Sequence, residues 1–296
     1  MALDEGRIRK PARKLGKLIK RMPRSAGAEE IHDFRAHSRR LETVLHTLSF
    51  DTTKRGRRLN KRVAKLRKRA GKVRDFDVLT EYISDLPHHD SERQCSVRLL
   101  EYLGAEREKQ ANRFHKAQQR HFSSLRRALK RASKEIGRII QPRGDGRLNG
   151  TTISAMVAAS ALTTLSDLRN PPRLRKTNLH EYRLKVKTMR SLLQMAERAD
   201  DQPFVDRLGE VKDAIGEWHD WEVLVSIAKE VLNHEGGCRL MEELRKKAAV
   251  TYKNALVLSE SMRKEYLHIT KLEPGRVSKP AQPSPSVLSA AAALAA

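Results

Sequence analysis

The chain has 296 residues, and 61 lysines and arginines against 36 acidic residues give it a formal charge of +25 and a sequence pI near 10.4. Two cysteines, Cys95 and Cys238, exclude a disulfide framework and a cysteine-rich zinc module, and they indicate a reducing compartment. With 39% hydrophobic and 33% charged residues, the core has to come from amphipathic segments, which favours helices, and the excess positive charge needs an anionic partner.

Helical periodicity runs through almost the whole chain and is interrupted only at proline- and glycine-containing positions: Pro23, Pro87, 141–150 and Pro171-Pro172. Because alternating strand patterns with paired turn signals are absent, we expect an all-α protein. Four segments follow: a basic N-terminal segment (1–24), a first helical half (25–150), a second helical half (151–272) and a Pro/Ser/Ala-rich tail (273–296) that we expect to be disordered.

No apolar stretch is long enough to cross a bilayer, which takes about 20 residues. The basic residues near the N-terminus are not followed by the apolar region of a secretory signal. We therefore expect a cytoplasmic protein with no membrane partner.

Positive charge is concentrated in the first 150 residues, which hold 39 basic and 18 acidic side chains, against 22 and 18 in the remainder. Residues 54–74 alone carry twelve lysines or arginines and no acid, interleaved with apolar residues at helical spacing. A solvated helix face is the simplest interpretation of such a run. The like charges repel one another along the helix, however, and a bound polyanion would relieve that cost.

The two halves of the chain resemble each other. A shift of 148 residues places Ile31-His32-Asp33-Phe34-Arg35 on Leu179-His180-Glu181-Tyr182-Arg183, and the apolar positions that follow also coincide. A shift of 145 sets residues 71–79, GKVRDFDVL, against 216–224, GEWHDWEVL. Agreement of His, Arg, Gly and Asp at two separate places is stronger evidence than apolar phase alone. The chain is therefore expected to contain two similar helical bundles.

One polar stripe flanks the apolar face of the first helix in each half. At about 100° per residue it collects His32, Arg35 and Arg39 in the first half, and His180, Arg183, Lys187 and Arg190 in the second. Arginine offers several donors in a fixed fork and stays charged, and successive helical turns place such donors along a line, as a linear phosphate chain requires. Solvated arginines beside core-edge histidines are the alternative, and the recurrence weighs against it.

These motifs resemble the CHAD family, the conserved histidine α-helical domain, over roughly residues 25–270. The resemblance rests on His32-x-x-Arg35-x-x-x-Arg39-Arg40, on His180-x-x-Arg183-x-x-x-Lys187, and on the two Gly-x-x-[Arg/His]-Asp segments. It implies a pair of four-helix bundles related by approximate two-fold internal symmetry, with a basic groove or pore that binds inorganic polyphosphate. The residues it implicates are His32, Arg35, Arg39, Arg40, His180, Arg183, Lys187 and Arg190. Thr188 stands where the first half has Arg40, and Glu42 stands opposite Arg190, so such a groove would be asymmetric.

Further basic residues on later helices of the first half could widen this surface: Lys72, Arg113, Lys116 and Arg120. A polyphosphate near the histidines should raise their pKa, so that binding strengthens as the pH falls. For a protein of this kind, a cytoplasmic location would extend to polyphosphate granules.

Several alternatives compete with polyphosphate binding. Asp75, Asp77, Asp220 and Glu222 could be metal ligands of a phosphohydrolase, but such pairs are weak signals. We favour Asp75 and Asp220 as residues that begin a helix after a glycine break, or that pair with an arginine of the preceding helix. We expect no catalytic residue, metal or cofactor, and regard Trp218 and Trp221 as core aromatics. Few aromatic residues disfavour single-stranded nucleic acid, whereas duplex binding through phosphates stays open. A third alternative is a scaffold that recruits other proteins to polyphosphate-rich bodies through the tail, for which the sequence indicates no particular protein partner.

Overall fold

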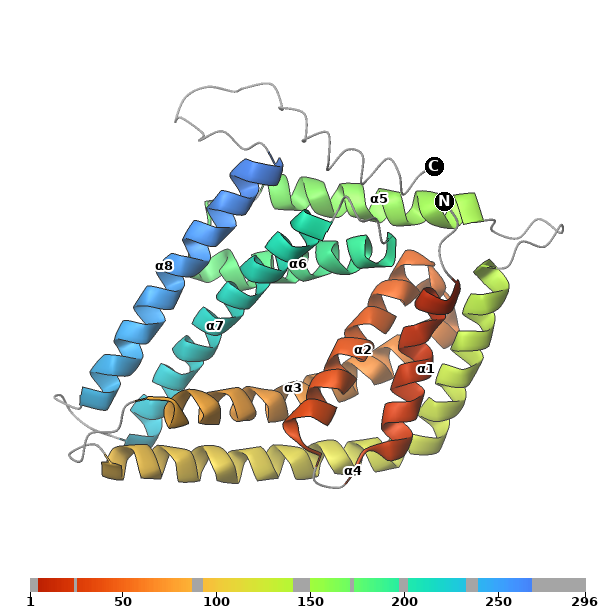
Figure 1. The fold of residues 1–296 in the computed structure, drawn as a ribbon. Coiled ribbons are helices and arrows are strands. Elements are labelled where there is room, and N and C mark those ends of the chain that lie inside the picture. Colours follow the sequence, from red (N-terminus) through yellow and green to blue (C-terminus); the bar gives the residue numbers. More distant parts are fainter. Residues whose placement is uncertain are drawn as a thin grey trace. The chain divides into compact units, whose positions relative to one another are not determined.

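The computed structural model describes residues 5–23, 26–86, 93–140, 150–170, 173–196, 202–232 and 239–267. This part of the chain contains eight α-helices, one short 3-10 helix and no strand, which confirms the predicted all-α class (Figure 1). The elements are α1 (Glu5–Arg21), α2 (Ala28–Thr47), η1 (Phe50–Thr52), α3 (Lys54–Ser84), α4 (Arg93–Ile140), α5 (Gly150–Arg169), α6 (Lys176–Ala196), α7 (Gln202–Leu232) and α8 (Arg239–Leu267). The predicted disordered tail, 273–296, lies outside the described residues.

The helices form two compact units. Among the described residues, the first unit comprises those of 5–139 and 220–248, and the second comprises those of 140–219 and 249–267. Helices α7 and α8 each contribute one segment to each unit, so the units do not follow the chain-order halves 25–150 and 151–272. None of the described helices is both long and apolar enough to cross a membrane.

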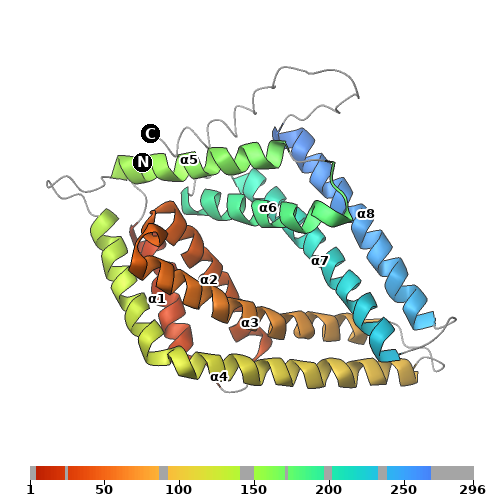
Figure 2. The ribbon, with the colours of Figure 1, turned by 180° about the vertical axis from the view of Figure 1, so that it is seen from behind.

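In the first unit, α2 packs against α1 and α3 (Figures 1 and 2). Helix α4 contacts α1 through the amide of Gln118, which donates to the carbonyl of Ile19 at 3.0 Å. It contacts α3 through Arg69, whose Nη1 donates to the carbonyl of Arg113 at 3.3 Å. The basic segment 1–24 is therefore largely helical: α1 buries Ile8, Leu15 and Ile19 within this unit.

A tight connection joins α2 to α3. Ser49 adopts a left-handed conformation with φ of 50°, and the hydroxyl of Thr53 then caps α3 by accepting a hydrogen bond from the Gly56 amide at 2.9 Å. A Cβ on residue 56 would lie 2.7 Å from the Phe50 ring and would overlap the Phe50 backbone. Only glycine fits where the first turn of α3 approaches η1 so closely.

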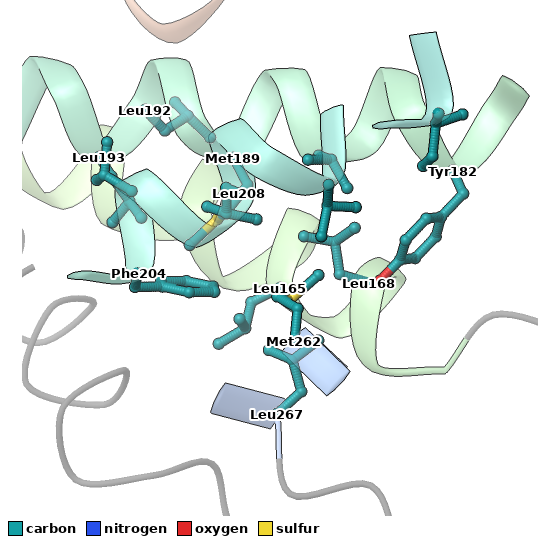
Figure 3. Close-up of a cluster of buried hydrophobic side chains, with 14 of the residues drawn as sticks. Leu165, Leu168, Tyr182, Met189, Leu192, Leu193, Phe204, Leu208, Met262 and Leu267 are labelled. Atoms are coloured by element: carbon teal, nitrogen blue, oxygen red, sulfur yellow. The ribbon is translucent and has the colours of Figure 1, made fainter. Parts of the chain in front are cut away.

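The second unit has a core drawn from four helices (Figure 3). Tyr182, Met189 and Leu193 of α6 meet Leu165 of α5 and Phe204 of α7, and α8 adds Met262 and Leu267. The Tyr182 hydroxyl is buried without a hydrogen-bond partner, and burial raises its pKa well above the ordinary range. These residues include the apolar stripe that the sequence predicts on this helix: Leu179, Tyr182, Met189, Leu192 and Leu193 are buried, and its last member, Ala196, lies outside the described side chains.

A second buried cluster belongs to the first unit. It joins the C-terminal half of α3 and the start of α4 to the 220–248 segment, and Tyr82 stacks on Trp221 with ring centroids 4.4 Å apart. Trp218 lies in the core of the second unit, and both tryptophans are buried. The interpretation of Trp218 and Trp221 as core aromatics is confirmed.

Candidate functional site

Helix α2 carries the polar stripe of the first unit along the edge of its buried face. Ile31, Phe34 and Leu41 are buried, whereas Arg35 and Arg39 are half-buried and His32 and Arg40 are exposed. This gradient follows from helical geometry, because residues three or four positions apart share a face and the stripe lies beside the core residues. Four of the predicted site residues therefore follow one helix at the border between core and solvent.

Arg35 lies across α3. The Arg35 Nη2 atom is 3.8 Å from where a Cβ on Gly71 would stand, and Nη1 lies 3.7 Å from Oδ1 of Asp75. Burial lowers the pKa of Arg35, while the carboxylates of Asp75 and Asp220 oppose that effect. Asp75 is more than half exposed, so this is a weak ion pair, and the guanidinium remains a positive group at the surface.

Helix α6 repeats this arrangement in the second unit. His180 is exposed, and Arg183, Lys187 and Arg190 are half-buried. Nε of Arg183 donates to the carbonyl of Lys212 at 3.0 Å, and Nε of Arg190 donates to the carbonyl of Val205 at 3.3 Å. Both arginines are thus held on the backbone of α7.

Two glycines of α7 make room for these arginines. A Cβ on Gly216 would stand 2.8 Å from Cζ of Arg183, and one on Gly209 would stand 3.4 Å from Nε of Arg190. Each pair is seven residues apart on its own helix, which corresponds to about 10 Å along the axis. The two guanidinium groups therefore lie one after the other along α7.

These glycines lie inside helices rather than at breaks. Gly71 is within α3 (Lys54–Ser84) and Gly216 is within α7 (Gln202–Leu232), so the interpretation of Asp75 and Asp220 as helix-starting residues is wrong. An interior glycine costs a helix about 1 kcal/mol relative to alanine, and here it permits the close approach of an arginine. The alternative interpretation, pairing with an arginine of the preceding helix, is confirmed for Asp75 by its contact with Arg35.

His180 lies beside another histidine that the sequence analysis did not assign to the stripe. The rings of His180 and His219 have centroids 5.1 Å apart. Burial lowers the pKa of His180, and the positive charges of Arg183 and Lys187 lower it further. His219 comes from α7, so only the packing of the two helices could reveal this neighbour.

The stripes of the two units differ where the sequences differ. Glu42 on α2 corresponds to Arg190 on α6 under the shift of 148 residues. Nη2 of Arg67 binds the Glu42 carboxylate at 2.8 Å, so in the first unit the positive group at this position of the stripe comes from α3. Thr188, which replaces Arg40, is exposed, and its hydroxyl donates to the Leu184 carbonyl at 3.1 Å.

The remaining predicted residues are Lys72 on α3 and a row on α4, Arg113, Lys116 and Arg120, and all four are exposed. Arg67 of α3 faces α2, whereas Arg69 contacts the backbone of Arg113 on α4. Two residues along a helix correspond to a turn of about 200°. At Arg113, α4 therefore lies beside the flank of α3 that carries Arg69, and Phe114 of α4 meets Phe34 of α2 with ring centroids 5.5 Å apart.

Two of the four carboxylates considered as metal ligands, Asp75 and Asp77, pair with arginines. Asp77, with a side chain only 10% exposed, accepts a hydrogen bond from Nε of Arg107 at 2.5 Å, and Arg107 also donates to the carbonyl of Ala26. Across the described ranges, no group of three or more His, Cys, Asp or Glu residues is arranged to hold a metal ion.

Comparison with known proteins identifies the family. The sequence model of the CHAD domain matches residues 12–229, and the protein belongs to the CHAD domain family. Two similar solved structures have a TM-score of 0.56. The crystal structure of the CHAD domain from the plant Ricinus communis is 16% identical and covers 95% of this chain and 91% of that chain. PptA from Streptomyces chartreusis is 14% identical and covers 88% and 94%. At these identities the likeness shows the fold alone, and no curated protein matches the chain.

Proposed function

We propose that this protein binds inorganic polyphosphate through the stripes on α2 and α6, and that it is a binding protein and not a polyphosphate hydrolase. The proposal includes the approximate two-fold internal symmetry and the basic groove or pore predicted from the sequence, with both stripes contacting one phosphate chain. The CHAD family is linked to polyphosphate binding in general. A cytoplasmic location, extending to polyphosphate granules, goes with this proposal.

The observation that supports it most directly is the recurrence of one contact. Arg35 lies over Gly71 in the first unit and Arg183 lies over Gly216 in the second. The two arginines coincide under a shift of 148 residues and the two glycines under a shift of 145. The sequence repeat is thus matched by a repeated arrangement of arginine and glycine.

The chemistry of the row on α6 suits a linear polyanion. Because the Nε atoms of Arg183 and Arg190 donate hydrogen bonds to backbone carbonyls of α7, the two guanidinium groups are oriented before a ligand binds. Oriented groups lose less conformational entropy on binding. Arginine donors bind phosphate oxygens through charge-assisted hydrogen bonds, and displaced counterions add a salt-dependent gain in affinity.

A binding role is favoured over hydrolysis by the state of the carboxylates. The largely buried Asp77 pairs with Arg107, whereas Asp75 forms only a weak, more than half-exposed pair with Arg35. A buried carboxylate that is already paired with a cation makes a poor ligand for a catalytic metal ion, because binding the metal would leave its partner unpaired. Release of phosphate from polyphosphate in the presence of Mg²⁺ or Mn²⁺, and its loss in Asp75→Ala, would contradict the non-enzymatic part of the proposal.

The experiment compares binding of long-chain polyphosphate and of duplex DNA with equal phosphate content, at rising salt concentration. The variant is Arg35→Gln with Arg183→Gln, and its matched control is Arg98→Gln with Arg245→Gln, which removes the same charge from exposed positions of α4 and α8. We expect the first pair to lose roughly 100-fold in polyphosphate affinity and the control to change little. If both variants lost polyphosphate affinity equally and DNA bound as tightly as polyphosphate, the overall positive charge would explain binding without any specific site. Nucleic-acid binding would then be the favoured function.

A further inference from the structure

An arginine-lined pocket lies in the first unit between the start of α3 and the C-terminal part of α4. It has a volume of about 300 Å³, and α3 and α4 both contribute arginines to its wall. Its floor is apolar, with Phe50, Leu59 and Ala132 buried beneath it. The polar lining consists of Arg55, Arg58, Arg62, Ser124, Arg127, Arg131 and Glu135.

This pocket is separate from the stripe on α2. Arg58 and Arg62 line it, whereas Arg67 and Gly71 face α2, where they contact Glu42 and Arg35. Each member of the first pair is nine residues from its counterpart in the second, and nine residues of α-helix correspond to about 900°, or half a turn beyond two full turns. The pocket therefore opens on the flank of α3 opposite the α2 stripe.

The pocket holds positive charge that the folded chain does not neutralise. Five arginines and one glutamate give its lining a formal charge of +4. Within the described residues, all of these arginines except Arg127 lack both an ion pair and a hydrogen bond, and Nε of Arg127 reaches only the Ser123 carbonyl, at 3.4 Å. Their like charges, three and four residues apart on α3 and four residues apart on α4, repel one another.

The start of α3 adds to this positive potential. Its first turn contains no acidic residue, although acidic side chains are the ones that the positive end of a helix dipole favours there. Lys54, Arg55 and Arg57 occupy the turn instead, and Arg58 follows directly. These basic residues destabilise the start of α3 in the free protein. A bound anion would make their contribution to stability favourable.

We propose that this pocket binds a compact diphosphate or triphosphate group, independently of the polyphosphate stripes. Guanidinium forks approach from two helices, so one small ligand can receive donors on both sides. The volume is at the lower end of the range of roughly 300 to 1,000 Å³ found for small-molecule sites, which suits a short oligophosphate. The buried apolar floor excludes water from one side and strengthens the charge interactions above it.

The test is titration calorimetry with inorganic tripolyphosphate and, in a separate arm, with ATP, because both carry the triphosphate group. The variant Arg58→Gln with Arg131→Gln removes one arginine from each wall. The control, Lys61→Gln with Arg126→Gln, removes equal charge from exposed neighbours on the same helices that do not line the pocket. The pocket variant is expected to lose roughly 100-fold in tripolyphosphate affinity, and the control to stay within about threefold of wild type.

The arms and variants separate the outcomes. Equal binding of tripolyphosphate and ATP indicates the phosphates alone as the ligand, and tighter binding of ATP indicates a nucleotide. Unchanged binding in the pocket variant, or an equal loss in the control, would overturn the proposal. Loss only in Arg35→Gln with Arg183→Gln would place the small anion on the stripes, and would overturn this proposal while leaving the proposed function intact.

Thermal unfolding without ligand provides a second readout. Since the pocket arginines repel one another, Arg58→Gln with Arg131→Gln should unfold at the same temperature as wild type or higher. A lower unfolding temperature would mean that these arginines stabilise the fold. It would contradict the inference that they serve to bind an anion.

Discussion

Alanine substitutions at Gly71 and Gly216 test whether arginines are held across α3 and α7. Both residues are buried in helix interiors, where replacing glycine by alanine gains about 1 kcal/mol. At Gly71 the new Cβ would be 3.8 Å from the nearest Arg35 atom, an ordinary contact, so Gly71→Ala should stabilise the protein by about that amount. At Gly216 the Cβ would displace the Arg183 guanidinium and break its bond to the Lys212 carbonyl.

Loss of a hydrogen bond from a charged donor costs about 1.5 kcal/mol or more. Gly216→Ala should therefore be about 0.5 kcal/mol less stable than wild type and about 1.5 kcal/mol less stable than Gly71→Ala. Urea unfolding followed by far-UV circular dichroism measures both. In the same samples, polyphosphate affinity should fall about tenfold in Gly216→Ala and stay unchanged in Gly71→Ala. If Gly216→Ala were as stable as Gly71→Ala and bound polyphosphate normally, Arg183 would not be positioned by α7.

Two further predictions concern titration and a buried ion pair. Burial, Arg183 and Lys187 hold the pKa of His180 below its ordinary value of 6.5 in the free protein, and the His219 ring is its neighbour on α7. The free protein should therefore lose stability as the pH falls through 6.5, whereas a bound polyanion raises this pKa and polyphosphate affinity should increase over the same range. Affinity in His180→Gln should respond less to pH, and an identical pH profile in wild type and variant would contradict this assignment. Arg107→Gln should lower the free energy of unfolding by about 2 kcal/mol, because Asp77 keeps a largely buried carboxylate without its cation. Denaturant unfolding at neutral pH measures the loss, and a change near zero would show that solvent already screens the pair.

Much of the fold follows from the apolar pattern of the sequence. The positions that coincide under the shift of 148 residues are buried in both helices: Phe34 and Leu41 on α2, and Tyr182 and Met189 on α6. Leaving a stripe of large apolar residues exposed to water is energetically unfavourable. Its burial in the core can therefore be predicted from the helical spacing alone.

The features that sequence reasoning missed depend on contacts between helices. A glycine between two helical patterns predicts a break, and only the neighbouring helix reveals that Gly71 and Gly216 accommodate arginines. In the same way, the pairing of Arg107 with Asp77 joins residues on different helices, as does the meeting of His180 with His219. The dense run at 54–74 indicated charge, but which of its arginines line a pocket depends on the approach of α4.

A crystal structure of the protein with a short polyphosphate would show whether the stripes on α2 and α6 bind one phosphate chain, as we propose. We expect phosphate oxygens within hydrogen-bonding distance of both Arg35 and Arg183 along a continuous chain. Density confined to other basic surfaces, with both arginines making only the protein contacts described above, would contradict it.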